Sequence, residues 1–292
     1  WCRDPGRSPL SRSMSDFPNS ARASLEAART VIVIPARYGS RRFPGKPLMM
    51  IRDETGTGKP LIQRSHEAGL AVRGIDLVAV ATDDSRIAAS VTGFDGNVLM
   101  TPDNCANGTE RVAACLDQLP QADLLVNLQG DALLTPPVFV EALVAHMRAN
   151  PLVQVSTIAV RCSTETFKHL ADDAVQGRVG GTTVVLNGKS EALYFSKRIL
   201  PYLPDDRLPD ANMPVLLHIG LYAYRRQALQ EYIAVGPTPL ETVEGLEQLR
   251  FLHAGIPVSV LTLEEQGYPI VEVNNPSDVP LVEKIFARRA LP

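Results

Sequence analysis

The chain has 292 residues, of which 45% are hydrophobic and 21% are charged, as in ordinary soluble globular proteins. Its formal net charge of −3 provides no overall positive field that would favour a nucleic-acid partner. No apolar run reaches the ~20 residues that a transmembrane helix needs, so we expect no membrane partner either.

The cysteines and the N-terminal residues indicate the cellular compartment and where the folded domain begins. The four cysteines form neither a CxxC pair nor a zinc-finger spacing, which is typical of a reducing compartment and predicts a cytoplasmic protein. Residues 1–29 are rich in Arg, Ser, Ala and Pro and lack the apolar core of a secretory signal. We interpret them as a disordered or non-native extension that precedes one domain at 30–292.

The first part of this domain alternates between strands and helices. Val31–Ile34 is a short apolar run, which predicts a strand buried on both faces of a parallel sheet. We then expect, in order, a helix at 62–70, a strand at 76–82, a helix at 86–91, a strand at 97–101, a helix at 108–119 and a strand at 123–128. Thr109 would lie at the N-cap or in the first turn of its helix. This alternation predicts βαβ units, and hence an α/β fold with a mostly parallel sheet.

After about residue 153 the pattern becomes richer in strands. We expect strands at 154–160, 182–186, 192–196, 218–224 and 257–263, and helices at 240–254 and 279–289. They predict an antiparallel extension of the sheet that covers the crevice and carries the second substrate. We therefore divide the domain into a nucleotide-binding half at 30–150 and an acceptor-binding and dimerisation half at 151–292.

Three polar clusters, at 35–46, 82–85 and 129–131, follow predicted strands. Because ligands bind beyond the carboxyl ends of parallel strands, we expect the clusters to converge on one crevice. In the first cluster, glycines let backbone N–H groups approach phosphate oxygens, while arginines and a lysine supply charge suited to a polyphosphate. The cluster is not a Walker A loop, since Pro47 stands where the metal-binding Ser or Thr would be.

Seven segments in order resemble the CMP-sugar synthetases, specifically the 3-deoxy-manno-octulosonate (KDO) cytidylyltransferase family. They read IPARYGSRRFPGKPL, ATDDSRI, NGTERVA, VNLQGD, ALYFSKRILP, LLHIGLYAYRR and PLETVEGLEQLR. The resemblance implies a nucleotide-diphospho-sugar transferase-like, Rossmann-like fold, CTP as the nucleotide donor, a small acidic acceptor, Mg²⁺, and a homodimer.

The resemblance also assigns roles to individual residues. Arg41 and Lys46 would bind the β- and γ-phosphates and, with Asp131, make up the catalytic set. Within the nucleotide site, Arg111 would read the cytosine edge. The residues expected to bind the nucleotide are Pro35, Ala36, Arg37, Ser40, Arg41, Lys46, Thr82, Asp83, Asn107, Gly108, Thr109, Arg111 and Gln129.

On the acceptor side, matching positions contact the sugar acid in this family: Gln129, Lys197, His218, Tyr222, Glu244 and Glu247. Lys197 stands where the family usually has arginine, which keeps the charge but loses the planar fork. We expect Glu241, on the same predicted helix, to be solvated. Since Tyr222 and Tyr224 flank Ala223, we expect only one of the two to face the pocket.

The expected metal site departs from the family pattern. Asp131 would hold Mg²⁺ together with phosphate oxygens and water. The second metal-binding carboxylate of the family corresponds to Asn274, whose amide offers one oxygen but no charge. This leaves three hypotheses open: a KDO cytidylyltransferase, an enzyme that activates a phosphonate such as phosphonoformate as its CMP conjugate, and a metal-impaired, non-catalytic nucleotide-binding protein.

Overall fold

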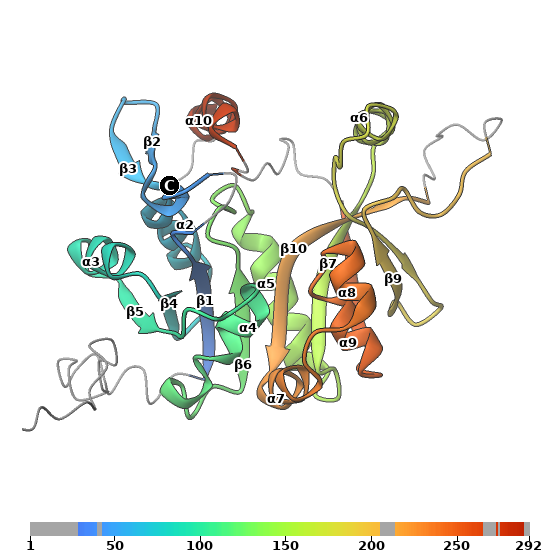
Figure 1. Ribbon diagram of the computed structural model, residues 1–292, viewed down its shortest axis with the longest axis horizontal. Coiled ribbons are helices and arrows are strands. Elements are labelled where there is room, and N and C mark those ends of the chain that lie inside the picture. The colour runs from blue at the N-terminus through green and yellow to red at the C-terminus, as the bar shows by residue number, and fades with distance from the viewer. Residues whose placement is uncertain (1–28, 40–42, 205–213, 265–272, 274, 289–292) are drawn as a thin grey trace, which may run out of the picture.

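The computed structural model describes residues 29–39, 43–204, 214–264, 273 and 275–288 (Figure 1). The predictions made for residues 1–28, Ser40, Arg41 and Asn274 therefore lie outside the described residues. Within the described part, no helix is long and apolar enough to cross a bilayer.

A nine-stranded sheet runs through the described chain in the order β11-β7-β10-β6-β1-β4-β5, with β8 paired to β10 and to β9. The strands are β1 (Thr30–Ala36), β4 (Leu77–Thr82), β5 (Asn97–Met100), β6 (Leu124–Leu128), β7 (Val155–Arg161), β8 (Thr183–Leu186), β9 (Ala192–Ser196), β10 (Leu216–Arg225) and β11 (Val258–Leu263). A small hairpin of β2 (Met50–Arg52) and β3 (Gly58–Pro60) stands apart from this sheet.

The first half of the sheet is parallel, as predicted. Strand β1 pairs in parallel with β4 on one side and β6 on the other, and β4 pairs in parallel with β5. The predicted antiparallel extension is present in β10, β8 and β9, although β11 runs parallel to β7. The extension continues the same sheet, because β10 lies between β6 and β7.

Helices cover both faces of this sheet (Figure 1). They are α2 (Leu61–Leu70), α3 (Ser85–Gly93), α4 (Gly108–Ala113), α5 (Pro137–Ala149), α6 (Thr164–Val175), α7 (Arg226–Val235), α8 (Pro239–Glu244), α9 (Leu249–His253) and α10 (Val279–Arg288), with short 3-10 turns η2 (Lys46–Leu48), η3 (Leu116–Gln118) and η4 (Pro276–Asp278). In β1, Val31 and Val33 join one core cluster and Ile32 and Ile34 the other, and all four are fully buried. This accounts for the continuous apolar run in the sequence.

Two predicted helices are shorter than expected. The helix predicted at 108–119 ends at Ala113 and is followed by η3. The helix predicted at 240–254 is interrupted by Gly245, which adopts the left-handed conformation (φ 63°) and separates α8 from α9. A glycine ends a helix readily because it meets no Cβ clash at positive φ. This break determines where Glu247 and Arg250 lie.

Candidate functional site

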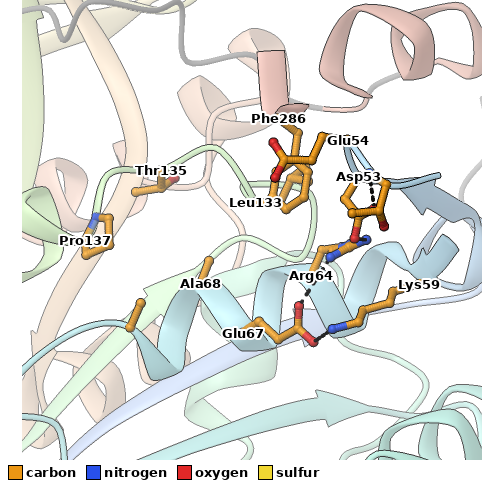
Figure 2. Close-up of a pocket in the computed structure, with 12 residues that line it drawn as sticks. Asp53, Glu54, Lys59, Arg64, Glu67, Ala68, Leu133, Thr135, Pro137 and Phe286 are labelled. Atoms are coloured by element: carbon orange, nitrogen blue, oxygen red, sulfur yellow. Dashed lines mark hydrogen bonds and ion pairs between the residues drawn. The ribbon is translucent and has the colours of Figure 1, made fainter. Parts of the chain in front are cut away.

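A cavity of about 460 Å³ lies beside α2 (Figure 2). Its polar end contains Arg64, whose Nη2 lies 3.0 Å from Asp53 Oδ2 and whose guanidinium lies 4.9 Å from the Phe286 ring. The charge of this buried arginine is therefore already neutralised within the wall. None of the residues predicted to bind a substrate lines this cavity.

The first and third polar clusters meet at the carboxyl ends of β1 and β6. Gly45, in the left-handed conformation (φ 73°), closes the basic loop by donating its N–H to the Tyr38 carbonyl at 3.0 Å. This turn begins η2, and the Lys46 ammonium contacts Asp131 Oδ2. The two side chains are 20% and 13% exposed, so the pair is shielded but open to a ligand. The cation expected to bind phosphate and the carboxylate expected to bind the metal ion are thus neighbours.

Gly130, just before Asp131, lies against the backbone of β1. A Cβ at this position would come within 2.8 Å of the Pro35 carbonyl oxygen, which cannot rotate away. The Gly130 carbonyl in turn accepts a hydrogen bond from Ser65 Oγ of α2 at 2.8 Å. Close packing of β1 and α2 around this glycine therefore fixes the direction in which Asp131 leaves the strand.

We expect Gly130→Ala to destabilise the protein by about 1–3 kcal/mol, because the added methyl group forces two backbones apart. The same shift should displace Asp131 and lower activity. Gly93→Ala is the matched control, since a Cβ there meets nothing within 4 Å. Urea unfolding and initial rates check both effects; equal stability of the two variants would contradict the packing argument.

The second polar cluster meets the predicted base-recognition segment. Arg111, only 3% exposed, lies with Nη1 2.5 Å from Thr101 Oγ1 and 3.0 Å from Asp83 Oδ1. Thr82, at the end of β4, is fully buried. The fork of Arg111 is therefore oriented by the end of β4, as convergence of the strand ends predicts. Its contact with a cytosine remains a prediction.

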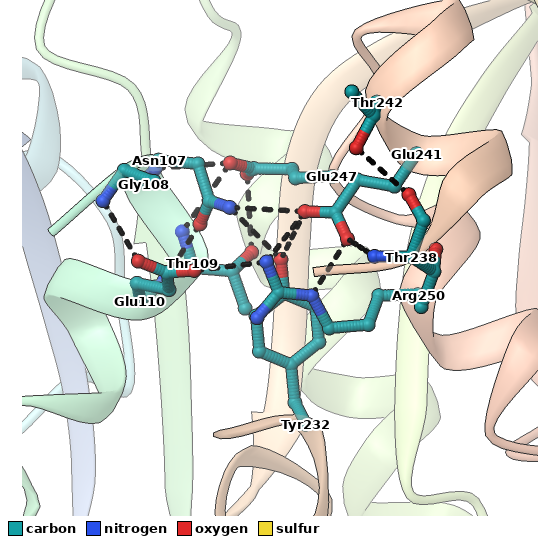
Figure 3. A network of polar contacts seen from close by, with 11 residues as sticks. Asn107, Gly108, Thr109, Glu110, Tyr232, Thr238, Glu241, Thr242, Glu247 and Arg250 are labelled. Carbon is teal, nitrogen blue, oxygen red and sulfur yellow. Dashed lines mark hydrogen bonds and ion pairs between the residues drawn. The ribbon is translucent and has the colours of Figure 1, made fainter. Parts of the chain in front are cut away.

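The segment Asn107–Thr109 is held from the other half of the chain. The Gly108 N–H donates to Glu247 Oε2 at 2.9 Å, and Thr109 Oγ1 donates to Glu247 Oε1 at 3.1 Å (Figure 3). A Cβ on Gly108 would lie 3.3 Å from Gln129 Nε2. Burial raises the pKa of the Glu247 carboxyl, while these hydrogen bonds oppose the shift. Residues predicted to bind the nucleotide therefore contact Glu247, which is predicted to bind the acceptor.

Asn107 is the N-cap of α4: its Oδ1 accepts the Glu110 N–H at 2.8 Å. Thr109, the alternative cap, lies in the first turn as the sequence analysis allowed. We expect Asn107→Ala to cost about 1 kcal/mol of stability and to raise the KM for CTP. Ser163→Ala removes an equivalent cap from α6, where Ser163 Oγ accepts the Thr166 N–H at 3.1 Å. Chemical unfolding should show a loss of stability in both variants, larger in Asn107→Ala because Asn107 Nδ2 also donates to Tyr232 OH at 3.0 Å. An equal rise in KM in both variants would contradict the assignment of Asn107 to the nucleotide site.

The predicted acceptor residues form two groups. Glu244 accepts hydrogen bonds from Ser196 Oγ at 2.9 Å and from the Lys197 N–H at 3.2 Å, so α8 meets the end of β9. His218 instead lies in β10 among aromatic rings, with centroids 5.0 Å from Phe195 and 5.3 Å from Tyr222. Burial lowers the pKa of His218 to about 3, and its Nε2 lies 3.0 Å from Thr157 Oγ1. At neutral pH this histidine therefore offers no positive charge.

Two expectations about neighbouring residues were wrong. Tyr222 and Tyr224 belong to the same core cluster and stack at 5.7 Å, since residues two apart in a strand point the same way. Glu241 is buried at 8% exposure instead of solvated, and its carboxylate contacts Arg250 Nη2 at 2.6 Å. The spacing along α8 could not show this, because α9 packs against α8 and the Tyr232 hydroxyl of α7 lies 3.5 Å from Glu241 Oε1.

Sequence reasoning also missed residues that support the site. Asn127 is fully buried in β6 next to Gln129, and Tyr224 OH lies 2.9 Å from Thr109 Oγ1. Asn127 could have been identified from the sequence, because it is the one polar residue within the apolar run LLVNL of β6. Arg250 could not have been identified in this way, since a single arginine near the end of a predicted helix is ordinarily exposed.

A metal ion at this site would need additional oxygen ligands from the substrate. Within the described residues, no group of three or more His, Cys, Asp or Glu side chains could hold a metal ion. Asp131 already faces a cation, the Lys46 ammonium. One carboxylate completed by phosphate oxygens and water is the arrangement that Mg²⁺ prefers, so the residues present fit this ion. Of the other predicted residues, Arg37 is exposed, and Pro35 and Ala36 end β1.

Comparison with known proteins places this geometry in context. Residues 31–263 match a family profile described as cytidylyltransferase. The 3-deoxy-manno-octulosonate cytidylyltransferase of Maricaulis maris is 44% identical over 87% of this chain and 96% of its own length. The protein of the same name from Chlamydia abortus is 40% identical over 88% and 93%.

Two solved structures share the fold. A CMP:2-keto-3-deoxy-manno-octonic acid synthetase complexed with CTP is 37% identical, with a TM-score of 0.75 over 89% of this chain and 99% of its own. A 4-diphosphocytidyl-2C-methyl-D-erythritol synthase from Anaerococcus prevotii is 12% identical with a TM-score of 0.55, covering 93% and 100%. The second likeness shows the fold alone, which agrees with the predicted nucleotide-sugar transferase class.

Proposed function

The chain belongs to the 3-deoxy-manno-octulosonate cytidylyltransferase family, and we propose from this premise that it transfers CMP from CTP to KDO. An acceptor hydroxyl oxygen attacks the α-phosphorus of CTP, and the bond from that phosphorus to the bridging oxygen breaks. The products are CMP-KDO, pyrophosphate and the proton lost by the hydroxyl. The observation that supports this most directly is the contact between Lys46 and Asp131, two residues after Gln129, whose side chain lies next to Gly108.

Lys46 acts on the leaving group in this proposal. Transfer at phosphorus needs chiefly positioning and neutralisation of developing charge. The shielded Lys46 ammonium at the start of η2 supplies that charge near the β- and γ-phosphates, and the basic loop with Arg37, Ser40 and Arg41 supplies the rest. The shielded position strengthens the effect, because a partly buried charge is screened less by water than an exposed one.

Asp131 would hold Mg²⁺, with Asn274 as a neutral second oxygen ligand. When bound, the ion would neutralise phosphate charge and polarise the reacting phosphorus. Asp131 itself has a second role that its contact supports: it orients the Lys46 ammonium before the substrate binds. Asp83, which follows Thr82 at the end of β4, contacts Arg111.

The acceptor would lie between Gln129 and the residues contributed by β9, β10, α8 and the turn that follows α8. His218 and Tyr222 give this side a neutral, aromatic wall. The positive charge that a sugar acid requires would therefore come from Lys197, which is exposed and lies over Gly245, where a Cβ would be 2.8 Å from its ammonium. Glu244 and Glu247 would accept hydrogen bonds from sugar hydroxyls.

An acceptor screen tests the proposed activity. The protein is incubated with CTP and Mg²⁺ and with KDO, phosphonoformate or an acylneuraminate, and the CMP conjugate is detected by mass. Phosphonoformate is included in the screen because Asn274 departs from the family pattern at the expected metal site. Turnover confined to phosphonoformate would replace KDO as the acceptor. CTP binding without any turnover would instead support the non-catalytic hypothesis.

We also propose a cytoplasmic homodimer. The resemblance to the family supports the dimer, with residues 151–292 as the dimerising half. The described cysteines, Cys105, Cys115 and Cys162, are free thiols, which is compatible with a reducing compartment. Sedimentation equilibrium over a range of protein concentrations would measure the oligomeric state.

A further inference from the structure

Arg250 is a buried cation outside the proposed substrate site, and it joins three helices. Its side chain is 1% exposed. Its Nη2 lies 2.8 Å from Glu110 Oε1 of α4 and 2.6 Å from Glu241 Oε1 of α8, while its Nε lies 2.7 Å from Glu241 Oε2 (Figure 3). The guanidinium also lies 4.0 Å from the centre of the Tyr232 ring of α7. A lysine could not reach all of these partners with one ammonium.

These partners hold the segment 106–110 on several sides. Asn107 Nδ2 donates to Tyr232 OH at 3.0 Å, and the Ala106 N–H donates to Glu110 Oε2 at 2.7 Å. Glu110 therefore uses one carboxylate oxygen for the loop and the other for Arg250. With the Glu247 contacts at Gly108, the position of the segment depends on residues of the second half of the chain.

We propose that Arg250 is a positioning residue: it fixes the segment 106–110 through Glu110 and so sets the affinity for CTP without touching it. This rests on the proposed function, in which the segment binds the nucleotide. A buried ion pair is weak support for stability as its purpose, because an apolar group of the same shape often serves as well. A planar fork between two carboxylates does fix orientation, which a base-binding segment requires.

Positioning and stability predict different kinetics. An interaction that only orients the nucleotide segment acts equally on bound CTP and on the transition state, so its loss raises KM and leaves kcat unchanged. A merely structural loss reduces the amount of folded enzyme, which lowers the apparent kcat and leaves KM unchanged. The two roles can therefore be separated in one set of measurements.

Glu110→Gln and Arg250→Lys are the test variants, with Arg64→Lys as the matched control. Arg64 is also buried, at 5% exposure, and pairs with Asp53, but it lies beside the cavity next to α2. The measurements are the Kd for CTP by calorimetry without acceptor, the steady-state KM and kcat, and the Tm. We expect both test variants to weaken CTP binding about tenfold, with kcat within about twofold, whereas Arg64→Lys lowers the Tm and leaves the Kd for CTP unchanged.

The Kd for CTP in folded Glu110→Gln decides the inference even if Arg250→Lys fails to fold. An unchanged Kd in that variant, or an equal weakening in Arg64→Lys, would overturn the positioning role. If the unaltered protein binds no CTP, the proposed function fails first, and the calorimetry reports this separately.

Discussion

Replacing Lys46 with methionine should lower kcat about 100- to 1,000-fold, the size of effect seen when one preorganised charge or donor is removed from a developing anion. The ammonium is shielded at 20% exposure and contacts Asp131, so the substitution removes a positive charge from a partly buried position. Methionine keeps most of the side-chain volume, which limits the loss of packing. Steady-state kinetics with CTP and KDO measure the effect.

Lys59→Met is the control for this prediction. Lys59 also forms a part-buried ion pair, with Glu67 at 2.6 Å, but it lies beside the cavity next to α2. We expect this variant to keep kcat within about twofold, because exposed or half-exposed pairs contribute little. Similar losses in both lysine variants would mean that Lys46 acts through general charge or stability, and not on pyrophosphate.

Asp131→Asn should lower kcat/KM by about 100-fold and raise the Mg²⁺ concentration required for half-maximal activity. The amide keeps the shape of the side chain but removes the charge that the divalent ion and Lys46 both require. Because Asn274 is already neutral, the variant would leave the expected metal site without a carboxylate from either Asp131 or position 274. A magnesium titration of initial rates measures both changes.

Asp53→Asn serves as the control, because Asp53 is also paired with a cation, Arg64, at 3.0 Å and is 23% exposed. Its magnesium requirement should match that of the unaltered protein. An unchanged magnesium requirement in Asp131→Asn would show that the ion binds elsewhere, and the assignment of Asp131 would then be wrong.

The parallel half of the fold could be predicted because its strands are buried on both faces. Such strands appear in the sequence as largely apolar runs, as in β1, β4 and β6, and a polar cluster follows each run at the carboxyl edge of the sheet. Convergence of the three clusters then followed from strand direction alone. The contact between Lys46 and Asp131 confirms this for the first and third clusters, whereas Asp83 of the second cluster contacts Arg111, which lies outside all three.

The helices were harder to predict than the parallel strands. Helix α5 begins at Pro137 and buries Phe139, Val140, Leu143, Val144 and Met147, a helical pattern present in the sequence but not identified. Gly245 is an example of a missed helix end: the sequence motif contains this glycine, but the predicted helix at 240–254 continues through it. Its left-handed backbone ends α8 and separates Glu244 from Glu247.

The supporting contacts of the site could not be predicted, because they join residues far apart in the chain. Glu241 is exposed or buried according to what packs on its helix face. Periodicity shows on which face of the helix a residue lies, but not which elements pack against that face. Its partner Arg250 lies nine residues on, beyond the break at Gly245, and Glu110 lies 140 residues before Arg250. Only the assembled sheet brings these side chains together.

The central claim is that this site joins CMP from CTP to KDO. Mass spectrometry of a reaction with CTP, Mg²⁺ and KDO, together with measurement of pyrophosphate, tests it most directly. We expect CMP-KDO and pyrophosphate in equal amounts, with no product when CTP is omitted. Pyrophosphate without a CMP-KDO adduct, or neither product while CTP binds, would contradict it.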